Sequence, residues 1–253
     1  MGTNAVQVGC LAAAVLLGPF LAGAHAQRNQ PIYPAYDGFL KNPDGSYTLS
    51  FAYFSHNAES VTIPPGGNNS FAPGPADRQQ PITFKPGHWR FQCVMVVGKD
   101  FDGKMLWTLS YSGTTTGTSQ RMMQSNWNLV EGAEELSKID YAKAPRGVCL
   151  NQAPSVHLLG AGRGASAKIA GVQSEPLNLF GSISDEGLPR SGSLTVLWKF
   201  VRGPGTVEFD NERAARTHAK FSAPGTYELD LSANDGELTS SMRVTVDVAA
   251  TGR

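Results

Sequence analysis

Apolar and polar side chains alternate along three runs in the first half of the chain. The runs are SYTLSFAYF, HWRFQCVMVV and KMLWTLSY, and their apolar faces carry Tyr47, Leu49, Phe51 and Tyr53, then Trp89, Phe91, Cys93, Met95 and Val97, then Met105, Trp107, Leu109 and Tyr111. Turn sequences rich in Asn, Pro, Asp and Gly separate the runs. Because a period of two with one polar face is typical of antiparallel strands, residues 33–112 are predicted to form a β-rich domain with sheets wetted on one side.

Alternation returns, more regularly, in the second half. Five runs, PLNLFGSIS, SLTVLWKFV, GTVEFD, TYELDLSA and SSMRVTVDV, carry on their apolar faces Leu177, Leu179 and Ile183; Leu194, Val196, Trp198 and Phe200; Val207 and Phe209; Tyr227, Leu229 and Leu231; and Val244, Val246 and Val248. Charged residues occupy the opposite positions of the last two runs, as at Glu228, Asp230, Arg243 and Asp247. Short strands joined by Gly, Pro and Asp turns predict a β-sandwich over residues 155–249.

The stretches LNLFGSISDEGLP, LTVLWKFVRGPGTVEF and THAKFSAPGTYELDLSANDGELTSSMRVTVDV, taken in order, resemble an extracellular PKD-like, immunoglobulin-type domain over residues 172–248. The resemblance implies an Ig-like fold and a non-catalytic role as a spacer, adhesion or interaction module. It places Trp198 on the third strand, where such sandwiches bury a large aromatic ring, and Tyr227 at a tyrosine corner. Leu229 stands where an antibody-type domain has a cysteine, so this core is expected to hold by packing alone.

The fold class predicted for the whole chain is all-β, with two tandem β-sandwich-like domains of which the second is Ig-like. The first domain, with YDGFLKNPDGSYTLSFAYF and NNSFAPGPADR, resembles a β-rich segment of uncharacterised exported bacterial proteins, a likeness that implies no activity. Residues 27–32 are predicted to be a linker. Residues 113–154 are predicted to be a second linker, in which NLVEGAEELSKIDYA has room for a short helix.

The first 26 residues have the features of a removable signal peptide. An apolar run over residues 8–23 is shorter than the roughly 20 residues that span a bilayer, and Ala24-His25-Ala26 follows it as a small-x-small cleavage signal. The alternative is an uncleaved anchor, since no Lys or Arg precedes the run. Cleavage near Ala26 would leave a periplasmic or secreted chain with no membrane span.

Two cysteines follow the leader, Cys93 and Cys149. In an oxidising compartment such a pair most simply forms one disulfide, which would tie residues 113–154 back onto the first domain. Two buried thiols or a two-cysteine metal site are the alternatives, and no His has zinc-ligand spacing to either cysteine.

Gly160, Gly162 and Ala165 stand at the spacing of a dinucleotide-binding turn. Such a turn needs a helix of about ten residues behind it, whose N-terminal amides meet the pyrophosphate. Only SAKIA separates Ala165 from Gly171, and Pro176 follows soon after. We therefore interpret VHLLG as a strand and GAGRGAS as a loop, with no nucleotide cofactor.

Charge and motif content give little support to nucleic-acid binding or catalysis. The 21 acidic and 21 basic residues balance, and no dense basic patch is present. The four histidines of the mature chain, His56, His88, His157 and His218, belong to no catalytic sequence motif. An enzyme is not expected, although a triad assembled in space from scattered residues stays open.

Two kinds of ligand site are weaker candidates. Asp185, Glu186, Asp235 and Glu237 lie in predicted loops of the second domain, and carboxylates are what Ca²⁺ binds; the same residues also serve as ordinary turn formers, which is the favoured interpretation. Trp127, in the polar context SNWN, is the best candidate for an exposed ring that stacks on a sugar.

These features predict an exported, non-catalytic protein that acts as a binding, adhesion or spacer module at the cell envelope. Its partner, a protein or a glycan, is not identified by the sequence. A carbohydrate-binding accessory module and a small secreted hydrolase are the alternatives.

Overall fold

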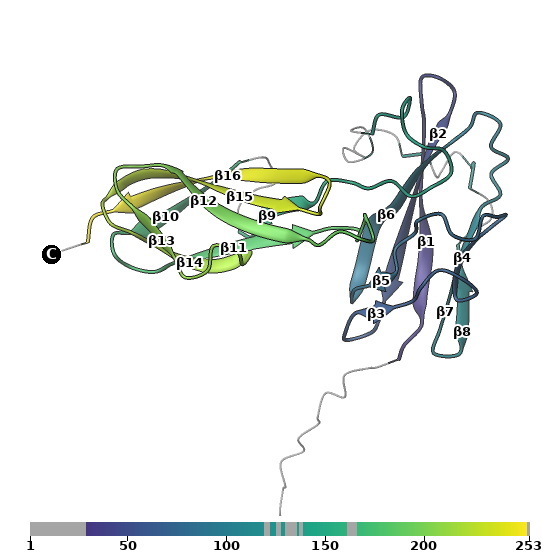
Figure 1. Cartoon of the computed structure of the whole chain (residues 1–253), viewed down its shortest axis with the longest axis horizontal. Coiled ribbons are helices and arrows are strands. Elements are labelled where there is room, and N and C mark those ends of the chain that lie inside the picture. The colour runs from purple at the N-terminus through teal and green to yellow at the C-terminus, as the bar shows by residue number, and fades with distance from the viewer. Residues whose placement is uncertain are drawn as a thin grey trace, which may run out of the picture.

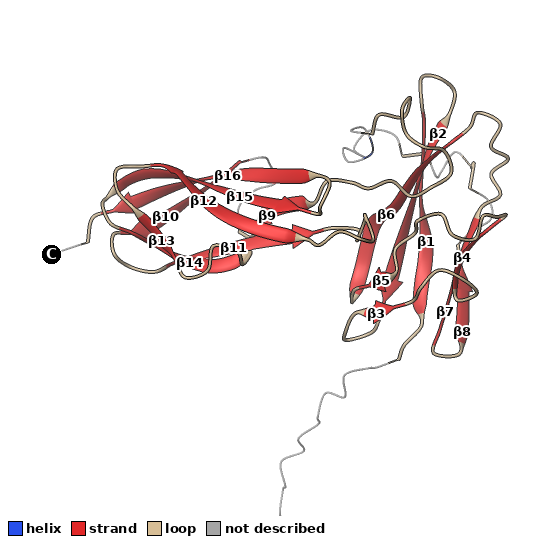
Figure 2. Ribbon diagram, viewed as in Figure 1, coloured by secondary structure: helices blue, strands red, loops and turns tan. Residues whose placement is uncertain are grey.

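The computed structural model describes residues 29–118, 122–124, 128–129, 136, 139–160 and 166–251, and every named element within them is a β-strand. Two lobes, each built of strands, lie end to side, with the long axis of the second lobe crossing the strands of the first (Figures 1 and 2). The chain is all-β, as its alternation predicts. The proposed leader, Gly162, Ala165, Trp127 and most of the helix candidate lie outside the described residues.

The first lobe contains two sheets and a short ribbon. Their strands are β1 (Ile32–Lys41), β2 (Tyr47–Ser55) and β6 (Gly87–Val97) in one sheet, β4 (Asn69–Ala72), β7 (Leu106–Tyr111) and β8 (Thr114–Gly117) in the other, and β3 (Val61–Thr62) with β5 (Thr83–Phe84) in the ribbon. Strand β8 falls in the stretch that the sequence pattern treats as linker. It continues the β7 hairpin, because Ser112 and Gly113 both adopt the positive φ that a tight turn requires.

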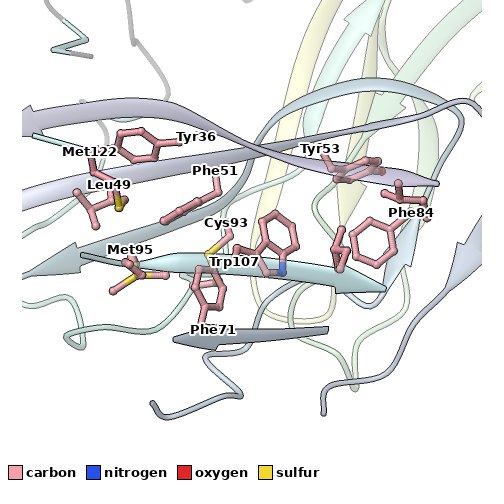
Figure 3. Packing of buried hydrophobic residues seen from close by; sticks show 14 of the residues in the cluster. Tyr36, Leu49, Phe51, Tyr53, Phe71, Phe84, Cys93, Met95, Trp107 and Met122 are labelled. Carbon is pink, nitrogen blue, oxygen red and sulfur yellow. A yellow bond between two sulfur atoms is a disulfide. The ribbon is translucent and has the colours of Figure 1, made fainter. Parts of the chain in front are cut away.

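Aromatic rings from the two sheets meet in the core of this lobe (Figure 3). Phe51 of the first sheet contacts Phe71 and Trp107 of the second edge to face, at centroid distances of 5.2 and 6.4 Å. The Trp107 indole N–H donates to the buried Asn69 side chain over 2.9 Å, so its one polar group is satisfied.

The expectation that one face of each sheet is wet is wrong for β2 and the end of β6. Thr48, Ser50 and Ala52, on the supposedly polar face of β2, are buried, as are Val94 and Val96. The hydroxyls of this face find partners: Thr48 donates to Asn42 and Ser50 to Asp37. Later segments also extend the sheet at both edges. Leu129 donates its N–H to a carbonyl of β1, and Gly147 and Leu150 donate theirs to carbonyls of β6.

The predicted disulfide between Cys93 and Cys149 is present. It joins β6 to the returning segment across a sequence separation of 56 residues, with 4.8 Å between the Cα atoms. Both cysteines are buried in the core of the first lobe. The bridge therefore anchors the chain at the point where it leaves this lobe for the second.

The second lobe is a sandwich of two four-stranded sheets with immunoglobulin-like strand order. One sheet has the order β13 (Val207–Phe209), β14 (Arg216–Phe221), β11 (Leu177–Ser184), β9 (Ser155–Leu158); the other has the order β10 (Ser166–Val172), β16 (Thr239–Ala249), β15 (Gly225–Asn234), β12 (Thr195–Arg202). The first strand is divided between the sheets, since β9 pairs antiparallel with β11 and β10 pairs parallel with β16.

Three residues that the resemblance singled out lie in the core of the second lobe. Trp198 on β12 and Tyr227 and Leu229 on β15 are buried. The Tyr227 hydroxyl donates to the Ala223 carbonyl over 2.8 Å and accepts from the Ala223 N–H over 3.2 Å. Leu194, placed on the inner face by its register, is instead exposed because it precedes β12 in the connecting loop.

The segment after Gly160 also has a defined role. Ser166–Val172, where a dinucleotide turn would need a helix, is the strand β10. In the part of the chain that the structure describes, no helix is long and apolar enough to cross a membrane.

Candidate functional site

Three segments of the second lobe gather at the end that faces the first lobe. They are the connection 150–154, the β11–β12 loop (185–194) and the β15–β16 loop (235–238); together with the first-lobe residues that they contact, we call them the domain junction. The two loops touch through their backbones: a Cβ on Gly192 would lie 2.0 Å from the Asp235 carbonyl oxygen. Only glycine fits there, so this residue allows the loops to pack together.

Arg190 forms the most specific contact of the domain junction. Its guanidinium donates to both carboxylate oxygens of Asp77 in the first lobe, each over 2.9 Å, and to the Gln80 carbonyl over 2.7 Å. A planar guanidinium that grips both oxygens fixes orientation as well as distance. The Arg190 hydrogen bonds hold the pKa of the Asp77 carboxyl below its usual range.

Leu188, two residues earlier in the same loop, inserts into the core of the first lobe. Its side chain is 3% exposed and belongs to the same buried cluster as Phe51 and Trp107. Two further hydrogen bonds cross the domain junction: Lys85 donates to the Asp185 carbonyl over 3.3 Å, and Gln152 donates to the Phe91 carbonyl over 2.9 Å. The two lobes are thus packed against each other as well as joined by the connection 150–154.

Acidic side chains lie inside this contact. Asp185 and Glu186 open the β11–β12 loop, and Asp235 opens the β15–β16 loop. Asp185 accepts the Gly187 N–H over 2.8 Å, and Asp235 accepts the N–H groups of Glu237 and Leu238 over 2.7 Å each. These bonds are the turn-forming role that the sequence favoured for the acids.

The turn role uses only one oxygen of each aspartate. Asp185 Oδ1 and Asp235 Oδ2 are buried and have no hydrogen-bond partner among the residues that the structure describes. Asp235 is only 2% exposed and Glu186 only 7%. Orphan carboxylate oxygens at this depth are uncommon in folded proteins.

Burial and the charge of neighbouring carboxylates raise the pKa of two of these groups, Glu186 and Asp185. Burial raises the pKa of Glu186 to about 8, with a smaller contribution from the Asp185 and Asp235 charges, although the Gln152 N–H opposes the rise. Burial also raises the pKa of Asp185, and the charge of Asp235 adds to that rise while Lys85 opposes it. Glu186 and Asp185 therefore ionise less readily than exposed carboxyls do.

The connection between the lobes contributes an amide to the same place. The Asn151 Nδ2 donates to the Glu237 carboxylate over 3.2 Å, and the next residue, Gln152, donates its N–H to Glu186 over 2.8 Å. Asn151 Oδ1 is buried and has no partner within the described residues. Glu237 itself is exposed.

Three of the four acidic candidates from the sequence therefore converge, whereas Glu237 lies at their margin. Among the described residues, no set of three or more His, Cys, Asp or Glu side chains is arranged to hold a metal ion by itself. Sequence reasoning missed Asn151, Arg190 and Leu188, because no local pattern reveals contacts between residues as far apart as Asn151 and Glu237 (86 positions) or Arg190 and Asp77 (113 positions).

A second candidate surface lies on the outer face of the sheet of the second lobe that contains β11, β13 and β14. A shallow hollow there is lined by Asn178, Phe180, Asp210, Arg216 and His218, among others. The Phe180 ring is 47% exposed, and the His218 Nδ1 lies 2.9 Å from an Asp210 carboxylate oxygen. The hollow combines one apolar ring with several hydrogen-bonding groups.

The described chain is thus an all-β protein whose second lobe has an immunoglobulin-like fold. No protein-family model matches it. Solved structures similar to it include a nucleoside hydrolase-related hypothetical protein from Saccharophagus degradans (18% identity, 53% of this chain and 35% of that one, TM-score 0.37) and Drosophila N-cadherin EC1-3 (13%, 87% and 68%, 0.31). Fibronectin(III)-like modules of Clostridium thermocellum CbhA are also similar (11%, 86% and 94%, 0.26). The fold assignment rests on the strand order, and the chain spans about a third of the length of the first of these proteins.

Proposed function

We propose that the chain is an exported, non-catalytic module that holds two β-domains in one fixed orientation and presents them together to a macromolecular partner at the cell envelope. The observation that supports this proposal is the docking of the β11–β12 loop, through Leu188 and Arg190, onto the first lobe. The Cys93–Cys149 disulfide fits an oxidising compartment. Immunoglobulin-like domains are a common framework for binding loops, which argues by analogy only.

A fixed orientation matters for binding because two sites on one rigid body engage a partner in a single event. The linked second contact then gains from effective concentration, which raises the overall affinity by about 100-fold or more when the geometry fits. Loosening the domain junction leaves the lobes covalently linked, so it should reduce this gain but not abolish it.

The test is sedimentation of the mature, purified protein with cell envelopes isolated from its source. The wild type should bind saturably, and the double variant Leu188→Ala/Arg190→Ala, once shown by circular dichroism to be folded, should bind about tenfold more weakly. Equal binding by both proteins, or none by either, would refute the proposal. Turnover in a hydrolase screen that depends on one His or carboxylate would favour the secreted hydrolase instead.

Sugar binding is a second candidate, and the hollow around Phe180 favours it. An exposed ring beside an amide, a carboxylate and an imidazole is a surface on which a sugar ring can stack and donate hydrogen bonds. Trp127, the ring first proposed for this role, lies outside the described residues. A glycan array separates the two rings: loss of a bound glycan in Phe180→Ala alone places the site at the hollow, whereas loss in Trp127→Ala alone places it elsewhere.

A further inference from the structure

Arg78, in the connection between β4 and β5, carries a buried positive charge. The residue is only 8% exposed, and its guanidinium donates to backbone carbonyls alone. Nη1 donates to Gly147 over 2.6 Å, and Nη2 donates to Pro73 and Gly74 over 3.0 and 2.9 Å. Three of the five guanidinium N–H groups therefore have acceptors, whereas the buried Nε has none among the described residues.

No carboxylate in the described part of the chain forms an ion pair with Arg78. Burial lowers the pKa of its guanidinium, as expected for a cation that has lost water. Arginine is seldom buried this deeply without an anionic partner, because carbonyl dipoles replace the hydration of the charge but do not neutralise it. The charge of Arg78 thus calls for an anion from outside the described residues.

Neighbouring backbone holds Arg78 in one place. Its N–H donates to the Gln80 side chain over 2.7 Å, and its carbonyl accepts the N–H of the disulfide-bonded Cys149 over 2.7 Å. Gly147 approaches so closely that a Cβ there would lie 2.8 Å from Arg78 Nη1, and its φ of +71° also favours glycine. The guanidinium is therefore fixed before any ligand arrives.

Arg78 lines an open pocket of about 470 Å³ in the first lobe. The other charged lining residues are Arg146, Lys104, Asp100 and Asp102, so three cations face two acids and one positive charge is in excess. Asp102 accepts the Lys104 N–H over 2.9 Å, which is a local turn contact. The balance of charge in this pocket favours an anionic ligand.

One wall of the pocket is apolar. It is formed by the end of β6 and the turn that follows, through Val97, Phe101 and Met105. Val97 and Met105 also belong to the buried cluster of the first lobe, so this wall is part of a packed core and keeps its shape. A ligand that fits has an apolar part as well as a negative charge.

We propose that this pocket binds a small organic acid, whose carboxylate pairs with Arg78 and whose hydrocarbon part packs on the apolar wall. A guanidinium recognises a carboxylate by charge and by hydrogen bonds together. The volume lies in the range of about 300–1,000 Å³ that is usual for small-molecule pockets. Inorganic phosphate has the charge but would leave the apolar wall in contact with water.

This inference goes beyond the proposed function, since it assigns a small ligand to the first lobe alone. Binding of the acid is measured on the purified protein without cell envelopes. Either result can therefore fail without the other.

The test is an NMR titration of the full ¹⁵N-labelled chain with sodium benzoate at constant ionic strength. The amide signals of Gly98, Phe101 and Gly147, which line the pocket, should shift saturably. Arg78→Gln should weaken binding by about tenfold or more, the loss that follows removal of a charged hydrogen-bonding partner. The control Arg213→Gln, which removes an exposed arginine of the second lobe, should bind benzoate as the wild type does.

A second variant covers the case in which Arg78→Gln does not fold. Arg146→Gln/Lys104→Gln changes two largely exposed side chains, so it should fold and bind benzoate about two- to fivefold more weakly, with a difference that shrinks as salt is added. Absence of saturable shifts in the wild type would overturn the proposal. So would unchanged affinity in folded Arg78→Gln or, if that variant does not fold, in the double variant. Inorganic phosphate that binds as tightly as benzoate would overturn the assignment to an organic acid.

Discussion

Single polar groups decide how well the second lobe holds together, and the Tyr227 hydroxyl is the clearest example. It both donates to and accepts from the backbone of Ala223, so it ties the turn before β15 to the core. The ring beneath it packs edge to face on Phe221 at 4.8 Å. Since no disulfide joins the sheets of this lobe, Leu229 and these contacts must supply the cohesion by packing.

Tyr227→Phe is expected to lower the free energy of unfolding by about 1–2 kcal/mol, because it leaves the Ala223 N–H and carbonyl without their partner. Urea denaturation followed by near-ultraviolet circular dichroism measures the change. The control Tyr33→Phe removes a hydroxyl from an exposed ring and should alter stability by less than about 0.5 kcal/mol. If the urea midpoint of Tyr227→Phe equals that of the wild type, the hydrogen bonds of the Tyr227 hydroxyl contribute nothing to stability.

The disulfide is the corresponding residue-level feature that stabilises the first lobe. Cys93→Ala/Cys149→Ala should lower the free energy of unfolding by about 4 kcal/mol, the chain entropy lost on closing a loop of this length. Denaturation under oxidising and reducing conditions should give different midpoints for the wild type and the same midpoint for the variant. Identical wild-type midpoints would contradict the account.

At the scale of elements, the β11–β12 loop is the most important for the contact between the lobes, since it belongs to one lobe and packs into the other. In the sequence, SDEGLPRSG has the composition of an ordinary turn, and Asp185 does cap such a turn. Nothing in the local pattern distinguishes Leu188, which is buried in the other lobe, from an exposed loop leucine such as Leu238.

Leu188→Ala is expected to destabilise the first lobe by about 2–5 kcal/mol, the cost of removing a buried leucine side chain and leaving a cavity. Leu238→Ala, in the neighbouring loop, should cost less than about 0.5 kcal/mol because that side chain is already exposed. Amide hydrogen exchange in the core of the first lobe measures the destabilisation caused by each variant. Equal protection in both variants would mean that Leu188 does not dock.

The Arg190–Asp77 pair makes the domain junction sensitive to acid. The folded pKa of Asp77 is depressed below its ordinary value of 3.8, so the stabilising effect of the pair is complete above that value and is lost as the pH falls through the lower folded pKa. Both side chains are partly exposed, so the effect is modest. The wild type should lose more stability between pH 5 and pH 2.5 than Arg190→Ala does, and parallel pH profiles would contradict this.

Elements differ in how well their sequences reveal them. The strands with regular alternation, β2, β7, β15 and β16, are predictable because each has an apolar inner face. Strand β1 escapes the pattern because Pro34 and a bulge at Gly38 interrupt it, which an edge strand tolerates. Strand β10 follows a run of Gly and Ala whose spacing resembles a nucleotide-binding turn. Only the parallel pairing with β16 identifies the residues after this run as a strand.

The candidate site is less predictable than the fold. The acids at 185, 186 and 235 are visible as loop residues, but their burial depends on how the two lobes meet. Asn151 gives no signal at all, since an isolated Asn in a connection is ordinary. Long-range contacts of this kind leave no periodic trace in a single sequence.

For the molecule as a whole, the account depends on two lobes that move as one body. The disulfide anchors the exit from the first lobe, and Leu188 and Arg190 of the second lobe return to pack against it. Interfaces between domains are often loose. This packing is therefore the feature that distinguishes one rigid body from two domains that move independently on a linker.

Residual dipolar couplings of the purified protein, measured by NMR in a weakly aligning medium, test this claim most directly. The account predicts that couplings from β2 and β6 and those from β15 and β16 fit one common alignment tensor. In Leu188→Ala/Arg190→Ala the two sets should require different tensors. Different tensors for the two lobes of the wild type would contradict the account.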